Sequence, residues 1–286
     1  MPIDLSKAVG AELPALTYEY DQYKLILYAL GVGAGADSDA LKFCYENQTG
    51  FAALPTFGVI PPFPALAGLL AAPGVDINLM MLLHGEQYME VRKQPATGGG
   101  KLTTKPKITS VFDKVKGALI ELESDTTDES GDVVYFNRIG VFIRGEGGFG
   151  GEKGPAPGNE APDRAPDKVV EEATVPWQAM LYRLSGDVNP LHIDPNFAAM
   201  GGFEKPIIHG LCTFGFAGRA ILKSYCDNDP ANFKSVKVRF TRHVFPGETI
   251  ITEMWDEGGG KILFKVKTKE RPEETAIGNA VAMVNA

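Results

Sequence analysis

The stretch Leu211-Cys-Thr-Phe-Gly-Phe-Ala-Gly-Arg-Ala-Ile-Leu-Lys-Ser-Tyr225 decides the fold, because it is apolar on nearly every side until Lys223. A helix of that composition must be enclosed by other elements. The segments after it, residues 235–242, 249–255 and 262–267, are rich in β-branched and aromatic side chains and are predicted to be strands. A buried helix beside antiparallel strands indicates an α+β architecture.

The first half of the chain repeats parts of this pattern. Thr56-Phe-Gly58 precedes Leu83-His-Gly-Glu86, and Thr213-Phe-Gly215 precedes Phe245-Pro-Gly-Glu248 after a similar interval. Residues 21–30 have helical periodicity, while residues 109–122 and 133–144 are strand-like. The shared order indicates a duplication and predicts two repeats, each with a sheet wrapped around its own helix.

Between the halves, residues 145–173 consist largely of Gly, Pro and charged side chains, which is typical of a linker. We therefore expect an N-terminal repeat at 1–150, a linker at 151–174 and a C-terminal repeat at 175–286. Gly145, Gly147 and Gly150 match the spacing of a dinucleotide-binding loop. The proline-containing residues that follow cannot open the required helix, so a dinucleotide site is not predicted.

The composition excludes several classes of partner. A formal net charge of −8 argues against nucleic acid and anionic membranes, and a polyanionic small ligand would need a local basic patch. Residues 51–75 are uncharged but interrupted by prolines, which predicts buried soluble structure and no membrane insertion. The start, Met1-Pro-Ile-Asp4, has no features of a secretory signal. Three cysteines without metal-like or disulfide spacing predict free thiols in an intracellular protein.

The run Tyr182-Arg-Leu-Ser-Gly-Asp-Val-Asn-Pro-Leu-His192 carries the densest set of polar groups. Pro190 fixes its own φ and favours an extended conformation at Asn189, so the run is predicted to be a stiff loop. Asp187 and His192 lie on either side of that proline, and a turn could aim both at one water molecule as an acid-base pair. The alternative is a loop in which Asp187 binds backbone groups and His192 packs on the proline.

A second cluster, Ile207-Ile-His-Gly210, stands immediately before the enclosed helix. The first amides of a helix have no internal partner, so the Gly210 N–H could donate to a developing oxyanion, such as that of a thioester carbonyl. The alternative is a glycine that serves only the turn. His209 fits a buried support better than a second base.

The run 182–192, together with His209-Gly-Leu211, resembles the signature of the 2-enoyl-CoA hydratase 2 family, the MaoC-like hydratases with a hot-dog fold. The likeness extends over nearly the whole chain, through Tyr28-Ala-Leu-Gly-Val-Gly33, Leu54-Pro-Thr-Phe-Gly58, Leu83-His-Gly-Glu-Gln-Tyr88 and Gly147-Gly-Phe-Gly-Gly151. It is greatest for the hydratase domain of the peroxisomal multifunctional β-oxidation enzyme. The resemblance implies a double hot-dog in which only the second repeat is catalytic, because the first has no Asp-x-Asn-Pro-x-His.

The resemblance also implies a role for each matching residue. Asp187 and His192 would hold the water that adds to a trans-2-enoyl-CoA, giving a (3R)-3-hydroxyacyl-CoA in fatty acid metabolism. Asn189 would orient the site, and the Gly210 amide would bind the thioester oxygen. The expected substrate contacts are His84, Gly85, Lys114 and Phe240, and the expected supporting residues are Tyr28, Glu46, Tyr182 and His209. No metal or redox cofactor is expected, and two copies of the chain would form a homodimer.

Several alternatives stay open at this point. A hot-dog thioesterase would release the thiol, a binding module would not turn over, and a metal site at Asp187 and His192 has few ligands. The family resemblance implies a peroxisomal protein, and otherwise a cytoplasmic one, because Val284-Asn-Ala286 is no Ser-Lys-Leu-like address. No dehydrogenase domain precedes the hydratase-like part, which indicates a free-standing enzyme or a fragment of a longer one.

Overall fold

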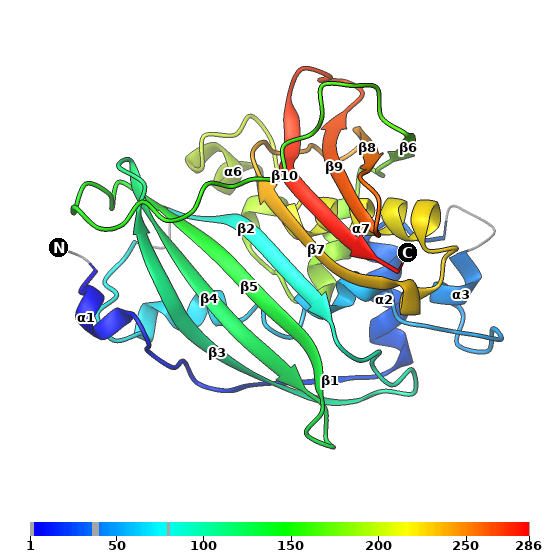
Figure 1. The fold of residues 1–286 in the computed structure, drawn as a ribbon, viewed down its shortest axis with the longest axis horizontal. Coiled ribbons are helices and arrows are strands. Elements are labelled where there is room, and N and C mark those ends of the chain that lie inside the picture. The colour runs from blue at the N-terminus through cyan, green and yellow to red at the C-terminus, as the bar shows by residue number, and fades with distance from the viewer. Residues whose placement is uncertain (1–2, 36–39, 79–80, 286) are drawn as a thin grey trace.

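A computed structural model describes residues 3–35, 40–78 and 81–285 of the chain. Met1, Pro2 and Ala286, on which the predictions about a secretory signal and a targeting tripeptide partly depend, lie outside the described residues. Ten strands form one antiparallel sheet in the order β1-β3-β4-β5-β2-β7-β10-β9-β8-β6 (Figure 1). The strands are β1 (Leu16–Tyr20), β2 (Leu82–Val91), β3 (Gly100–Asp113), β4 (Gly117–Thr127), β5 (Val133–Arg144), β6 (Lys168–Ala173), β7 (Phe233–Phe240), β8 (Thr249–Asp256), β9 (Lys261–Thr268) and β10 (Thr275–Val284).

The two halves of the sheet have the same internal order. The first half runs β1-β3-β4-β5-β2 and the second, from its outer edge inward, β6-β8-β9-β10-β7. They meet where β2 pairs with β7, with Glu86 opposite Arg239. This repeated order confirms the α+β double hot-dog, with one difference. The two predicted sheets are continuous, because β2 and β7 each satisfy the other's exposed backbone edge.

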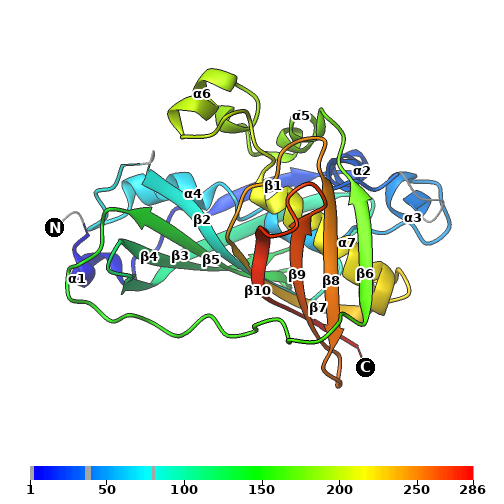
Figure 2. The same ribbon diagram turned by 90° about the horizontal axis from the view of Figure 1, so that it is seen from above.

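Most of the helices lie on one side of this sheet, which is the upper side in Figure 2. The long helix α7 (Gly210–Tyr225) has the predicted character, with eleven of its residues buried. Asp21 caps α2 (Gln22–Gly31) and Asp194 caps α6 (Pro195–Met200), both through their side-chain oxygens. The remaining helices are short: α1 (Leu5–Ala8), α3 (Leu41–Cys44), η2 (Pro55–Val59), α4 (Ala65–Gly68), η3 (Leu69–Ala71), α5 (Gln178–Tyr182), η5 (Arg183–Ser185), η6 (Pro190–His192) and η7 (Pro230–Asn232).

The first half has no uninterrupted counterpart of α7. The segments η2, α4 and η3 stand between β1 and β2, the place that α7 occupies between β6 and β7. Pro61, Pro62 and Pro64 break this stretch, because proline lacks the N–H that a helix interior needs. The first half therefore keeps the strand order of the predicted repeat, but its central segment is divided into η2, α4 and η3. The prediction of buried structure at 51–75 is confirmed for most of its residues, and none of the helices described is long and apolar enough to cross a membrane.

The larger of two hydrophobic cores surrounds α7 and draws on both halves. Phe214 and Phe216 of α7 pack in the same cluster as Tyr28, Phe57 and Tyr135 from the first half. A second cluster lies under the outer part of the first half, around Ile120 and Val141. The cysteines at 44, 212 and 226 are free, as predicted. One helix thus organises the core that supports both halves.

Three strand predictions need correction. Residues 109–122 are the two arms of the β3–β4 hairpin, whose turn places Val115 at a φ of 66°. The strand β6 lies within the residues expected to form the linker and pairs with β8 at the edge of the second half. The strand β10 was not predicted at all, because its Ala, Gly and Asn residues have weak strand propensity.

The glycine-rich segment at 145–151 binds a carboxylate of its own chain. Asp113 accepts hydrogen bonds from the backbone N–H groups of Gly148 and Gly150, both at 2.8 Å, and of Val115 at 2.8 Å. These donors lower the pKa of Asp113, the Gly148 N–H most of all. No helix follows in residues 151–167, so the glycines anchor the start of the linker.

The internal likeness between the halves is only partly structural. Thr56-Phe-Gly58 and Thr213-Phe-Gly215 fall on η2 and the first turns of α7, which are corresponding elements. Gly85-Glu86 lies within β2, whereas Gly247-Glu248 lies in the turn before β8. That second pair is therefore not equivalent, and the duplication rests on the strand order.

Candidate active site

Local hydrogen bonds stiffen the loop that follows α5. Gly186 has a φ of 136°, a conformation that L side chains rarely adopt, and this turns the chain away from η5. The side chain of Asp187 accepts from the Asn189 N–H at 3.1 Å, and the side chain of Asn189 accepts from the Leu191 N–H at 3.0 Å. Pro190 then opens η6, which ends on His192. The side chain of Asp187 thus does bind the backbone of its own loop, as the alternative interpretation predicted, but only through Oδ1.

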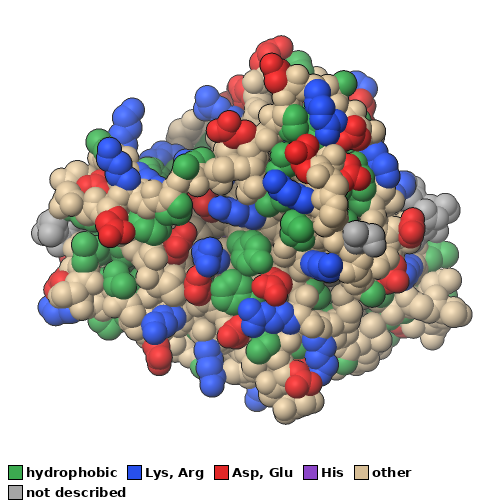
Figure 3. Space-filling model, viewed as in Figure 1, with side chains coloured by type: hydrophobic (Ala, Val, Ile, Leu, Met, Phe, Trp, Pro, Cys, Tyr) green, Lys and Arg blue, Asp and Glu red, His purple; other side chains and the backbone are tan. Residues whose placement is uncertain are grey.

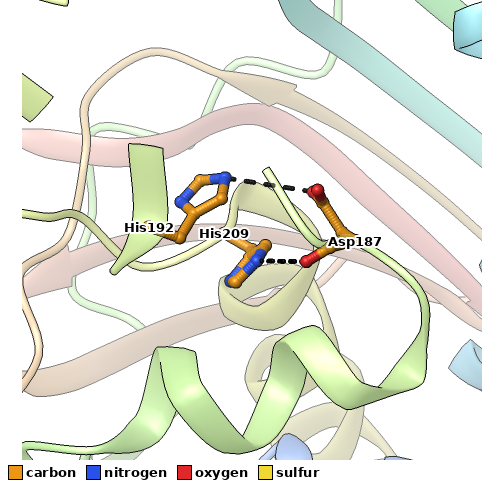
Figure 4. A group of neighbouring side chains, drawn as sticks. All are labelled: Asp187, His192 and His209. Carbon is orange, nitrogen blue, oxygen red and sulfur yellow. Dashed lines mark hydrogen bonds and ion pairs between the residues drawn. The ribbon is translucent and has the colours of Figure 1, made fainter. Parts of the chain in front are cut away.

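The other oxygen of Asp187 faces His192. Asp187 Oδ2 and His192 Nε2 lie 3.9 Å apart, and the two side chains are only 17% and 9% exposed (Figure 4). This separation is too long for a direct hydrogen bond, and one water molecule beside the pair, about 2.8 Å from each atom, would hydrogen-bond to both. His192 Nδ1 donates to the Ile207 carbonyl at 2.9 Å, which leaves Nε2 as the nitrogen that faces Asp187.

Burial shifts the pKa values of Asp187 and His192 toward each other. It raises the pKa of Asp187, an effect that His192 and the Asn189 N–H partly oppose. It lowers the pKa of His192, which Asp187 and the Ile207 carbonyl partly oppose. Because both shifts disfavour the charged forms, the two groups compete for a proton on more equal terms than in water. This is the condition that proton transfer requires.

His209 lies directly against the pair but has a different role. Its ring stacks on His192 with centroids 3.6 Å apart, and its Nε2 donates to the Asp187 backbone carbonyl at 3.0 Å. Burial lowers the pKa of His209 to about 2, so the ring stays neutral. The ring is therefore hydrogen-bonded to the Asp187 backbone, and its low pKa makes it a weak base.

Three of the four predicted supporting residues form a row behind the pair. Tyr182 packs on His209 with ring centroids 5.0 Å apart, and Tyr28 packs on Tyr182 at 6.2 Å. Both tyrosines are fully buried. Glu46 is different: its recorded polar contact is with the Asn47 amide, and none joins it to this row among the residues described.

Most of the predicted substrate contacts meet at the start of α7. Phe240 packs so closely on Gly210 that a Cβ at that glycine would lie 3.2 Å from the phenyl ring. The His84 ring contacts Phe240 edge to face, with centroids 5.1 Å apart. Gly85 follows at an irregularity in the pairing of β2 with β5. Gly210 is the first residue of α7, and among the described residues outside the helix its N–H has no backbone acceptor.

Lys114 lies apart from this group, in the β3–β4 turn. Its ammonium group donates to the Lys153 carbonyl and lies 5.5 Å from the Phe112 ring centroid. The pairing of β2, β5 and β4 puts this turn at the end of the sheet where β2 begins, close to His84 in register. Lys114 therefore does not join the group at the start of α7.

Asp187, His192 and His209 also form the one cluster, among described residues, whose ligand atoms could approach a metal ion, all within 4.8 Å of one another. Zinc takes imidazole nitrogens at about 2.0–2.1 Å along lone pairs that lie in the ring plane. The two rings are stacked at 27°, and each already donates from one nitrogen to a backbone carbonyl. In-plane lone pairs of stacked rings do not converge well, so the arrangement suits proton transfer better than metal binding.

Sequence reasoning missed the Ile207 carbonyl, which fixes the tautomer of His192. Because the backbone supplies this group, no side-chain pattern could reveal it. The carbonyl is placed by the Ile208 N–H, which donates to the Val244 carbonyl at 2.7 Å. The loop 182–192 is thereby connected, through His192 and Ile207, to the residues that follow β7.

The fold and the site together define a double hot-dog protein with a buried Asp/His pair. The MFE-2 hydratase 2 N-terminal domain model matches residues 18–145, and the MaoC like domain model matches residues 158–278. The chain belongs to this MaoC-like hydratase 2 family.

Individual relatives agree with this assignment. The probable enoyl-CoA hydratase 2 of Dictyostelium discoideum is 44% identical over 99% of this chain and 97% of its own. The peroxisomal multifunctional enzyme type 2 of Mus musculus is 46% identical over 96% of this chain but only 37% of its own. The crystal structure of a MaoC-like dehydratase from Phytophthora capsici superposes with a TM-score of 0.90 at 40% identity, covering 99% of this chain and 98% of that one. A Mycobacterium tuberculosis protein described as a double hotdog superposes at 0.56 with 14% identity, which supports the fold alone.

Proposed function

We propose that this protein catalyses the reversible hydration of trans-2-enoyl-CoA to (3R)-3-hydroxyacyl-CoA in fatty acid β-oxidation. The observation that carries the proposal is the 3.9 Å approach of Asp187 Oδ2 to His192 Nε2, which lets both atoms hydrogen-bond to one water molecule beside them. Relatives named as enoyl-CoA hydratase 2 support the same reaction.

Each step of the reaction has a group to perform it. One member of the pair takes a proton from the bound water while the water oxygen attacks the β-carbon of the conjugated thioester. The Gly210 N–H donates to the thioester oxygen as negative charge develops there, an effect typically worth about 2.7–4 kcal/mol. The pair then delivers a proton to the α-carbon, so that one water is added across the double bond. Because a single water site between two neighbouring groups serves both transfers, hydroxyl and proton add to the same face.

The remaining site residues bind or position the substrate. We assign His84, Gly85, Phe240 and Lys114 to contacts with the CoA thioester, Asn189 to orientation of the loop, and Tyr28, Tyr182 and His209 to support of the pair. Glu46 stays a predicted supporting residue.

We further propose that the enzyme needs no metal or redox cofactor, that it works as a homodimer, and that it acts in the peroxisome as several relatives' names suggest. The 1–150 and 175–286 repeats would divide the work, with the first accommodating the acyl chain.

One assay tests this function. Loss of the absorbance of the conjugated enoyl thioester, without release of free thiol, is the expected result, and chiral analysis should give the (3R) alcohol. Thiol release from the enoyl-CoA would show a thioesterase instead. No turnover with tight binding of saturated acyl-CoA would show a binding module. Activity that chelators abolish would contradict the metal-free mechanism.

A further inference from the structure

A row of buried amide side chains lies behind His84 and connects β2 to η2. His84 Nε2 lies 3.1 Å from Gln87 Oε1, and Gln87 Nε2 lies 2.9 Å from Asn137 Oδ1. Asn137 Nδ2 donates to the Gly58 carbonyl at 3.0 Å. Gln87 is 1% exposed and Asn137 is fully buried. Buried amides are unfavourable unless they are hydrogen-bonded, so these two are held by one another and by their neighbours.

The Gly58 carbonyl, at one end of this row, determines which group donates and which accepts in each hydrogen bond. A carbonyl oxygen only accepts, so Asn137 must present its NH₂ group to Gly58 and its oxygen to Gln87. Gln87 then donates from Nε2 both to Asn137 and to the Tyr88 carbonyl, which lies at 3.0 Å. The oxygen of Gln87 is therefore the atom that faces His84.

This order determines the tautomer of His84. An amide oxygen cannot donate, so His84 must carry its proton on Nε2 and a lone pair on Nδ1. Burial lowers the pKa of His84 to about 4, against smaller opposing effects of the Gln87 side chain and the Glu86 backbone, and this keeps the ring neutral near pH 7. A ring in this state offers a ligand an acceptor nitrogen and an apolar edge, but no positive charge.

We propose that Gln87 and Asn137 are positioning residues, which hold His84 as a single neutral tautomer against Phe240, so that it contacts the uncharged, amide-containing pantetheine arm of the thioester and not its phosphates. The inference rests on the proposed function. Phosphates need cations or N–H donors, whereas a pantetheine amide N–H is matched by an acceptor nitrogen. Phe240, which contacts His84 and also packs on Gly210, places that contact next to the proposed thioester site.

Two substitutions test the row. In Gln87→Glu the buried carboxylate would favour a doubly protonated His84, and in Gln87→Met the ring would lose its acceptor. The matched control is Gln94→Glu, because Gln94, in the loop after β2, donates to the Pro230 carbonyl at 2.9 Å, away from His84. The chain has four histidines, so ¹⁵N-labelled imidazole signals can be resolved, with His84→Phe used to assign them.

The expected wild-type spectrum shows His84 protonated on Nε2 alone at pH 6–8. In Gln87→Glu we expect both nitrogens protonated at pH 6, and in Gln87→Met a mixture of tautomers. Loss of one hydrogen bond that is equal in the ground and transition states should raise KM for enoyl-CoA by about 3- to 10-fold and leave kcat within about twofold. Gln94→Glu should change none of these values.

A wild-type His84 protonated on Nδ1 would overturn the proposal at once. So would unchanged His84 signals and unchanged KM in both Gln87 variants, or a fall in kcat without a rise in KM. The spectra do not depend on turnover. If the wild type fails to hydrate enoyl-CoA, the proposed function fails, and calorimetric affinity for butyryl-CoA then replaces KM as the test of the row.

Discussion

The two halves of the molecule share a strand order but differ in the segment between their first two strands. In the second half this segment holds the loop 182–192 and the continuous helix α7. In the first half prolines divide the corresponding stretch into η2, α4 and η3, and the sequence Asp-x-Asn-Pro-x-His is absent. The comparison indicates that the sheet serves as a common scaffold in both halves. The proposed chemistry depends on a stiff loop that ends beside the first amide of one unbroken helix.

The first half still contributes to that site. Tyr28 packs behind Tyr182, and His84 contacts Phe240 across the junction of β2 and β7. The outer face of the sheet, by contrast, carries Lys and Arg interspersed with Asp and Glu around a few apolar side chains (Figure 3). Its mixed charge offers no extended basic surface on this side. Division of labour between the halves, and not two independent sites, is the hypothesis that the following experiments address.

The largest effect should come from the pair itself. Asp187→Asn and His192→Ala should each reduce kcat by about 10²–10⁴-fold, because each removes one proton-transfer role. The change should leave the thermal unfolding midpoint near that of the wild type. Asp125→Asn, an exposed carboxylate on β4 of the first half, is the matched control and should keep full activity. Near-normal turnover in either site variant would refute the assignment.

The corresponding glycines of the two halves should be similar in their effect on stability. A Cβ at Gly58 would lie 2.4 Å from the Tyr135 ring, and one at Gly215 would lie 2.3 Å from Val32. Such overpacking typically costs about 1–3 kcal/mol. Urea unfolding of Gly58→Ala and Gly215→Ala should show that loss. Gly68→Ala, whose nearest contact is 3.6 Å away, should show none. A neutral Gly58→Ala would mean that the first half does not pack against its broken helix as described.

A smaller effect is expected at the helix start. In Gly210→Ala the new methyl group would push on Phe240, and small misplacements of a reacting group can cost up to about 10²-fold in rate. We expect kcat/KM to fall about tenfold while the free energy of unfolding changes little. An unchanged kcat/KM would argue against a role for this amide in oxyanion binding.

The smallest effect concerns pH. The pKa of His209 is about 2 in the folded protein and near 6.5 when unfolded, so below pH 6.5 the unfolded chain binds more protons. Its stabilising contribution is present above the unfolded pKa and is lost as the pH falls. Between pH 6 and 5 this group should remove about 1 kcal/mol of stability. His209→Gln should lack that part of the acid sensitivity in urea titrations, and an identical slope in both proteins would contradict its burial as a neutral ring.

Sequence patterns predicted the elements whose local preferences agree with their environment. Residues 133–144 coincide with β5, and the buried helix matches α7 except that it starts one residue earlier, at Gly210. The β3–β4 turn was missed because Val115 is a β-branched residue in a left-handed conformation, which no turn propensity indicates. The strand β6 was assigned to the linker because it is a six-residue edge strand, defined mainly by its pairing with β8.

The site was predictable to a similar extent. Two short sequence motifs contain the central residues of the site, which are Asp187, His192, His209 and Gly210. The structure brings the two motifs together, as expected. The contact of His84 with Phe240 depends on the pairing of β2 with β7, which only the assembled sheet creates. Glu46 and Lys114 do not join the central group, and only the family resemblance had indicated them.

Hydration of crotonyl-CoA in D₂O tests most directly whether Asp187 and His192 serve one shared water. NMR analysis of the product should show a (3R) alcohol with deuterium at C2 on the same face as the new hydroxyl, in a single diastereomer. The Asp187→Asn variant should yield little of it. Deuterium on the opposite face, or on both, would contradict proton transfer by a pair on one side of the substrate.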